Sequence, residues 1–206
     1  MAASGDLPPA ACRRRTGDRS PTTTLPDGTG PGPSRGGALM TQGAHAVDLL
    51  AWMLGDPVRV SAYSSHLAHQ GIEVEDTIAA TVEFAGGAIG TIGATTAAYP
   101  GMSVRLQLNG DAGTAVVDNE VLQFLHTRDA EPPDHPDKDN QAGRAAVPAG
   151  PSSVEAAHAA QYVDFIDAAE QGRPPAITTT DGRRVLALIL AAYESARHNG
   201  RPVDIS

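Results

Sequence analysis

Residues 36–55 read GGALMTQGAHAVDLLAWMLG, and this stretch decides the fold. Apolar residues recur in it at helical spacing, which predicts an amphipathic helix with one buried stripe, formed by Met40, Ala44, Val47, Ala51 and Leu54. The segment Gly55-Asp56-Pro57 ends the helix, because glycine readily adopts the left-handed conformation and proline cannot continue a helix. The chain therefore enters its folded part through a helix.

A second line of residues follows the neighbouring side of the same helix. Thr41, His45, Asp48 and Trp52 are spaced by four, three and four residues, so their side chains stack along it. A histidine with a hydroxyl one turn before it and a carboxylate one turn after it can be oriented as a proton carrier. Surface pairs and satisfied core pairs show the same pattern, so the helix alone leaves both interpretations open.

The residues after this helix alternate between apolar and polar side chains. Strands are expected at residues 58–63, 77–84, 88–96, 103–109, 114–118 and 120–126. The pair Gly86-Gly87 marks a tight turn between two of them. This pattern is typical of antiparallel hairpins with one polar face.

Two helices are predicted after the strands. Ser152 and Glu155 form a capping box for the first helix, whose inward face carries Tyr162, Phe165, Ile166 and Ala169. The last helix begins near Thr180-Asp181, stops at Gly200 and Pro202, and buries Val185, Leu186, Ile189 and Ala192. The order helix, strands, helix, helix predicts an α+β fold, an open and mainly antiparallel sheet with helices packed on one face.

Residues 1–35 differ in composition from the rest of the chain. They are rich in Pro, Gly, Ser, Thr and Arg, a mixture that buries too little apolar surface to offset the entropy of the chain. No apolar segment follows Arg13–Arg15, so this is not a secretory signal. We expect a disordered tail over 1–35 and one domain over 36–206.

Charge and residue usage exclude several classes of function. A net charge of −9 argues against nucleic acid as a partner. No run of eighteen apolar residues predicts a membrane span. The single cysteine, Cys12, has no disulfide partner and favours a reducing, cytoplasmic compartment.

The other polar candidates predict structural roles and no metal site. His66 and His69 are three residues apart near Glu73 and Glu75, but they follow no fixed ligand spacing. Asp76 is expected to orient the turn before its strand. Arg105 and Gln107 on a polar sheet face are predicted to line either a substrate cleft or an interface.

Three segments resemble a known family, namely 36–63 (GGALMTQGAHAVDLLAWMLGDPVRVSAY), 73–92 (EVEDTIAATVEFAGGAIGTI) and 181–203 (DGRRVLALILAAYESARHNGRPV). Together they resemble the carboxyl-terminal domain of the glucose–fructose oxidoreductase / inositol dehydrogenase / MocA family. The most specific parts are G-x-H-x-x-D-L-L and the later D-T-x-x-x-x-x-x-F-x-x-G. The family comprises NAD- or NADP-dependent oxidoreductases of sugars and cyclitols.

The resemblance assigns roles to four residues of the chain. It implies that His45 is the acid/base for a sugar hydroxyl, with Asp48 orienting the imidazole. Thr41, where many members carry Asp or Asn, is left to hydrogen-bond substrate or histidine. His158 lies on a helix that approaches the substrate pocket in several members. The resemblance also implies a homo-oligomer formed through the sheet face.

The cofactor motif of the family is not present in residues 1–206. Members begin with a dinucleotide-binding domain that carries G-x-G-x-x-G, whereas DGTGPGPSRGG at 27–37 follows no apolar strand and contains two prolines. The only lysine, Lys138, lies in a polar loop. We expect a substrate-binding and assembly domain of an NAD(P)-dependent sugar or cyclitol oxidoreductase, inactive alone. The alternatives are a non-catalytic binding or oligomerisation module, and a truncated gene-model fragment of a full-length oxidoreductase.

Overall fold

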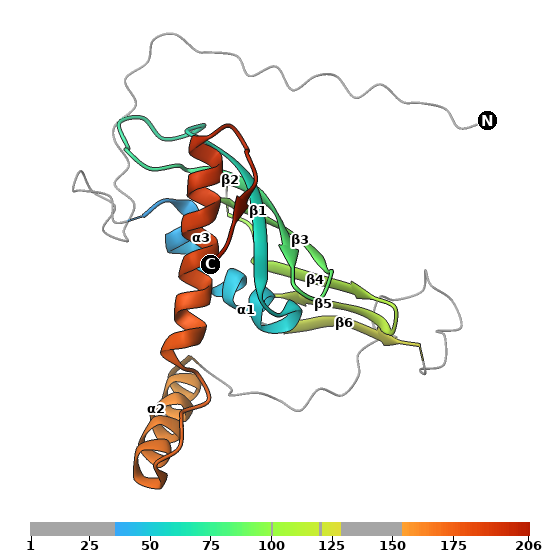
Figure 1. The fold of residues 1–206 in the computed structure, drawn as a ribbon, viewed down its shortest axis with the longest axis vertical. Coiled ribbons are helices and arrows are strands. Elements are labelled where there is room, and N and C mark those ends of the chain that lie inside the picture. Colours follow the sequence, from blue (N-terminus) through green and yellow to red (C-terminus); the bar gives the residue numbers. More distant parts are fainter. Residues whose placement is uncertain (1–35, 100, 120, 129–153) are drawn as a thin grey trace. The chain divides into compact units, whose positions relative to one another are not determined.

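The computed structural model describes residues 36–99, 101–119, 121–128 and 154–206, and its elements follow the predicted order. In chain order they are η1 (Leu39–Gly43), α1 (Ala44–Leu54), β1 (Pro57–Ser65), β2 (Thr77–Phe84), β3 (Ile89–Thr95), β4 (Arg105–Gly110), β5 (Gly113–Asp118), β6 (Val121–Thr127), α2 (Val154–Gln171), α3 (Thr179–Arg197) and β7 (Val203–Asp204) (Figure 1). The predicted tail over 1–35, Lys138 and the capping residue Ser152 lie outside the described residues.

The strands form two antiparallel sheets. One has the order β3-β2-β1-β7 and the other the order β4-β5-β6. The α+β class, with open antiparallel strands and helices on one face, is confirmed. Hydrogen bonding divides the strands between two ladders, a division that the alternation pattern did not predict.

The core lies between the four-stranded sheet and the helices α1 and α3 (Figure 1). In β2 every second residue is buried, and these are the four apolar residues expected from the alternation: Ile78, Ala80, Val82 and Phe84. The register places Val60 opposite Val82, so β1 presents its apolar side to the same core. Each large side chain buried there contributes roughly 1.5–3 kcal/mol.

The first helix buries its predicted stripe. Val47 and Ala51 are buried, and Met40, Ala44 and Leu54 pack against the core. The core also contains Leu39 and Leu50, which the predicted stripe omitted. Gly55 ends α1 with φ of 88°, the left-handed conformation expected of it.

Two predictions for the later helices are wrong. In α3 the residue Leu186 is exposed, and Leu188 is buried instead. The error is one of phase, since Val185, Leu188, Ile189 and Ala192 follow the helical period and Leu186 does not. In α2 the face assigned to the interior is exposed, and Ala168 is the buried apolar residue of that helix.

Ser195 joins the end of α3 to the edge of β1. Its side chain is fully buried, accepts a hydrogen bond from the Ala62 N–H at 2.9 Å and donates one to the Arg201 carbonyl at 2.7 Å. The hydroxyl thus pairs backbone groups that lie beyond the short β1–β7 ladder, which joins Arg59 to Asp204 and Val60 to Val203. It couples the last helix to the sheet.

Replacing Ser195 with alanine should lower the free energy of unfolding by about 1–3 kcal/mol, because two buried backbone groups lose their partner. Urea denaturation of the purified chain measures the change. Ser64→Ala, at an exposed position on β1, is the matched control and should stay within about 0.5 kcal/mol of wild type. Equal effects of the two substitutions would contradict this role for Ser195.

Within the described residues, none of the helices combines the length and hydropathy that a bilayer crossing requires.

Candidate functional site

The predicted site lies where the first helix begins. Residues Leu39–Gly43 form a π-helical turn, η1, which passes directly into α1. A π turn contains more residues than an α turn, and such turns occur frequently at functional sites. The wider turn changes the angular position of Thr41 relative to His45, so the straight line of side chains predicted from α-helical spacing is not maintained.

Three of the predicted site residues lie close together on this segment. His45 is exposed on the first turn of α1, and Asp48 is half-buried one turn later. Thr41 is exposed, and its hydroxyl donates a hydrogen bond to the Gly37 carbonyl at 2.9 Å. Among the described residues, no hydrogen bond or ion pair joins His45 to Thr41 or Asp48. The imidazole is therefore free to contact a ligand.

The fourth predicted residue, His158, is exposed on α2. No contact brings it to η1 or α1 among the described residues. Arg105 and Gln107 lie together on β4, where the Arg105 Nη2 donates to the Gln107 Oε1 at 3.3 Å. Only Thr41, His45 and Asp48 are thus gathered by the fold of this chain.

A buried carboxylate holds the start of this helix. Glu75 is 8% exposed, and its Oε1 accepts hydrogen bonds from the Leu39 N–H at 3.0 Å and the Tyr193 hydroxyl at 3.1 Å. The Tyr193 oxygen in turn accepts the Met40 N–H at 3.2 Å. A negative charge is favourable at a helix amino terminus, where the first N–H groups have no partner within the helix.

The same network fixes the protonation state of Tyr193. Burial, together with the nearby charge of Glu75, raises the pKa of Tyr193 to about 12. The phenol therefore stays protonated and donates to the carboxylate throughout the physiological range. Glu75 and Tyr193 are positioning residues for the helix that carries His45.

Asp76 organises the loop before β2, as the sequence predicted. It is 1% exposed, and its carboxylate accepts hydrogen bonds from the N–H groups of Leu67, Ala68 and His69 at 2.8–2.9 Å. Burial alone would raise the pKa of Asp76. The hydrogen bonds from these N–H groups and from the Thr77 side chain outweigh it and lower the pKa to about 2.

Acid should remove the stabilisation that Asp76 provides. Because its folded-state pKa lies below the ordinary value of 3.8, the carboxylate stabilises the fold above about pH 4, and this contribution is lost as pH falls through about 2. Urea denaturation should show Asp76→Asn about 2 kcal/mol less stable than wild type at pH 6, with a much smaller difference at pH 2. Asp111→Asn, on an exposed turn, is the control. A difference between Asp76→Asn and wild type that does not change with pH would contradict the assignment.

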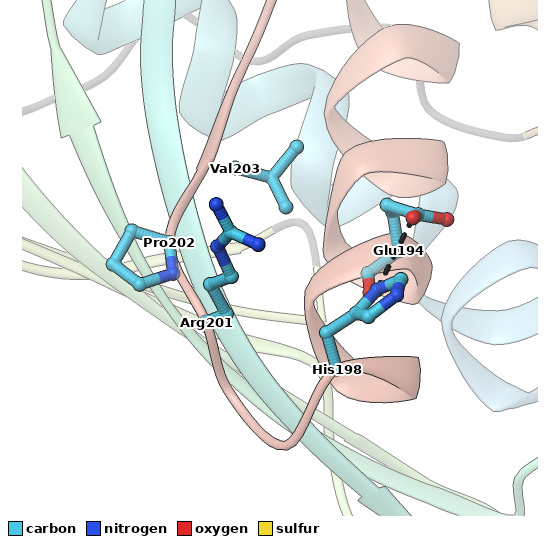
Figure 2. Close-up of a pocket in the computed structure, with 5 residues that line it drawn as sticks. All are labelled: Glu194, His198, Arg201, Pro202 and Val203. Atoms are coloured by element: carbon cyan, nitrogen blue, oxygen red, sulfur yellow. Dashed lines mark hydrogen bonds and ion pairs between the residues drawn. The ribbon is translucent and has the colours of Figure 1, made fainter.

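Two hollows indent the surface, and His45 lines neither of them. One, of about 70 Å³, lies between α1, β3 and β4, and is lined by Ala46, Val47, Leu50, Thr91, Ile92, Gly93, Arg105 and Leu106. The other, of about 340 Å³, is open and lies at the end of α3 (Figure 2). There the His198 Nδ1 lies 3.2 Å from the Glu194 Oε1, and the hydrogen bond from Arg197 lowers the pKa of Glu194. The Glu194 carboxylate is already paired, and no residue of the predicted site lines this hollow.

Sequence reasoning missed the two residues that hold the site. Glu75 was considered only as a neighbour of two histidines, although it stands directly before the family-like D-T at 76–77. Tyr193 lies at the centre of AAYESA in the last helix and was treated as ordinary packing. One signal was available: Glu75 lies between Val74 and Asp76 at the start of a buried strand, where an acid requires a partner.

The fold and the sequence are similar to those of known oxidoreductases. A family described as "Oxidoreductase family, C-terminal alpha/beta domain" matches residues 30–205. The WlbA dehydrogenase of Bordetella pertussis, solved with NADH and UDP-GlcNAcA, is 28% identical over 83% of this chain and 46% of its own, with a TM-score of 0.64. An oxidoreductase domain protein of Kribbella flavida is 26% identical over 83% of this chain and 52% of its own, with a TM-score of 0.65.

A more distant similarity shows the fold alone. Levoglucosan dehydrogenase, solved with NADH and levoglucosan, is 23% identical over 82% of this chain and 50% of its own, with a TM-score of 0.66. No protein with a curated description matches the chain significantly. The chain spans about half the length of the solved structures that it matches.

Proposed function

Because this chain belongs to the oxidoreductase family whose carboxyl-terminal α/β domain matches residues 30–205, we propose that it is the substrate-binding and assembly domain of an NAD- or NADP-dependent oxidoreductase of sugars, sugar derivatives or cyclitols. The observation that carries the proposal is this match over nearly every described residue. The similarity to a dehydrogenase solved with a nucleotide sugar supports the substrate class.

The described residues do not fit the dinucleotide themselves. Nicotinamide cofactors are bound through their pyrophosphate at a helix amino terminus that follows a glycine-rich turn. Here the helix that begins with η1 is capped by the Glu75 carboxylate, and α3 is capped by Thr178 and Asp181. Both ends already hold a carboxylate, which repels phosphate. The cofactor, which accepts a hydride, therefore belongs to another domain.

In this function the chain supplies the groups that bind the substrate and move its proton. The exposed imidazole of His45 accepts the proton of the sugar hydroxyl that is oxidised. Asp48, one turn further along α1, orients the ring when the substrate is bound. Thr41 already donates its hydroxyl proton to Gly37, so its oxygen is left as an acceptor for a substrate hydroxyl. His158 reaches the substrate only if α2 is brought to this side by a partner.

An assembly role is the second candidate function. The outward face of β1, β2 and β3 carries Ser61, Thr81 and Thr91 in one cross-strand row, with the exposed Tyr63 in the next. Small polar side chains on an open sheet allow another sheet to approach closely. We propose that a second copy of the chain associates through this face.

Ligand binding by the purified chain tests the proposal. Isothermal titration with UDP-GlcNAcA, glucose and inositol should give saturable heat with at least one of them, lost in Thr41→Ala/His45→Ala. NADH should give none. Mixing NAD⁺ and the bound sugar should give negligible turnover, since positioning two reactants contributes about 7–11 kcal/mol to catalysis. Turnover by the chain alone, abolished by His45→Ala, would refute the division of labour between two domains.

A further inference from the structure

The second helix directs its large apolar side chains to solvent. Tyr162, Phe165 and Ile166 are 70%, 62% and 55% exposed. At 100° per residue they share with Ala169 one sector about 100° wide, which we call the α2 face. The buried residue of the helix, Ala168, lies outside this sector. Isolated domains rarely expose large apolar side chains in one contiguous group, and such groups mark interaction sites.

The contacts of α2 show that the rest of this chain does not cover the face. The helix is tied to the following loop through Asp164, which accepts the Ala176 N–H and pairs with Arg173 at 2.9 Å. These bonds lie away from the α2 face and fix only the α2–α3 connection. The core formed by α1, α3 and the sheet is complete without any residue of α2.

We propose that the α2 face docks against the nucleotide-binding domain of the oxidoreductase, an inference that rests on the proposed function. Two observations identify this occupant. The matched dehydrogenases extend for about as many residues again beyond the part that this chain covers, and the family description places the matched part at their carboxyl end. The described residues hold no cofactor site, so the domain that supplies one must contact this chain closely enough to reach His45.

The charges of α2 define the chemistry of the docking partner. Its charged side chains are Glu155, Asp164, Asp167 and Glu170, and all are acidic. Asp167 and Glu170 border the α2 face. The surface that receives the helix is therefore an apolar groove with lysine or arginine side chains at its rim, since charge complementarity steers association and fixes register.

Hydrogen exchange in a chimaera tests the docking. The part of the Bordetella pertussis WlbA dehydrogenase that this chain does not cover is joined ahead of residue 36, and exchange of residues 154–171 is followed by mass spectrometry. We expect exchange at least ten-fold slower in the chimaera than in the chain alone. Phe165→Asp/Ile166→Asp should return it to the rate of the chain alone, whereas Ile89→Asp, an exposed change on β3, should leave the protection intact.

Three results would overturn the proposal. The first is equal exchange of α2 in the chimaera and in the chain alone. The second is a dimer of the chain alone, seen by light scattering, that Phe165→Asp/Ile166→Asp converts to a monomer, because a second copy would then occupy the face. The third is an α2 already protected in the chain alone, a measurement that needs no folded chimaera. Sugar oxidation by the chimaera that depends on His45 but occurs without α2 protection would sink the docking and leave the proposed function standing. Protection without such oxidation would do the reverse.

Discussion

Replacing Gly37 with alanine should lower the free energy of unfolding by about 2–5 kcal/mol, combining overpacking with the loss of buried hydrogen bonds. A Cβ at this position would lie 1.5 Å from the Glu75 Oε2 and 2.0 Å from its Cδ. An exposed carboxylate would move aside at little cost. This one is buried and holds the Leu39 N–H and the Tyr193 hydroxyl, so its displacement breaks the network at the start of η1.

Urea denaturation with a double-mutant cycle measures this effect and its cause. Gly86→Ala is the matched control, because no atom lies within 4 Å of its Cβ position. If the cost arises through Glu75, Gly37→Ala/Glu75→Ala should be no less stable than Glu75→Ala alone. Additive losses, or a Gly37→Ala protein as stable as Gly86→Ala, would contradict the role of the carboxylate.

Replacing His45 with alanine in the chimaera with the WlbA nucleotide-binding part should reduce kcat by about 10²–10⁴-fold, the range typical of a lost general acid or base. The ring is exposed and makes no hydrogen bond or ion pair among the described residues, so the substitution should leave the thermal midpoint nearly unchanged. Steady-state kinetics and a thermal scan of the same preparation separate catalysis from stability.

The pH profile distinguishes a proton carrier from a residue that only binds substrate. Loss of His45 should abolish the fall of kcat at acid pH, where a protonated imidazole cannot accept a proton. His198→Ala, an exposed histidine at the end of α3, should preserve both the rate and the profile. A His45→Ala enzyme with kcat within three-fold of the parent would exclude His45 as the acid/base.

The sequence predicted the elements whose pattern repeats over several turns or residues. Ile78, Ala80, Val82 and Phe84 alternate without interruption, and all four are buried. Errors arose where apolar residues stand next to one another. In VLALIL the helical phase is ambiguous, and Leu186 was placed inside where Leu188 belongs. In α2 the apolar face was correctly grouped, but a pattern cannot state whether the surface that covers it belongs to the same chain.

The candidate site was predictable in part. Local spacing was enough to bring His45 and Asp48 onto one helix. It did not predict the π turn that repositions Thr41, since no simple residue pattern specifies such a turn. The support of the site comes from Glu75 and Tyr193, which are 118 residues apart, and contacts at this separation depend on the packed fold.

The central claim is that a sugar binds this chain beside His45. Selectively labelled histidine, observed by nuclear magnetic resonance while the sugar or nucleotide sugar found by calorimetry is added, tests it most directly. The account predicts a saturable shift of the His45 imidazole resonances that follows the calorimetric isotherm, with His198 and His126 unmoved. Saturable binding that leaves His45 unchanged and shifts His198 instead would place the ligand in the hollow at the end of α3 and contradict the assignment.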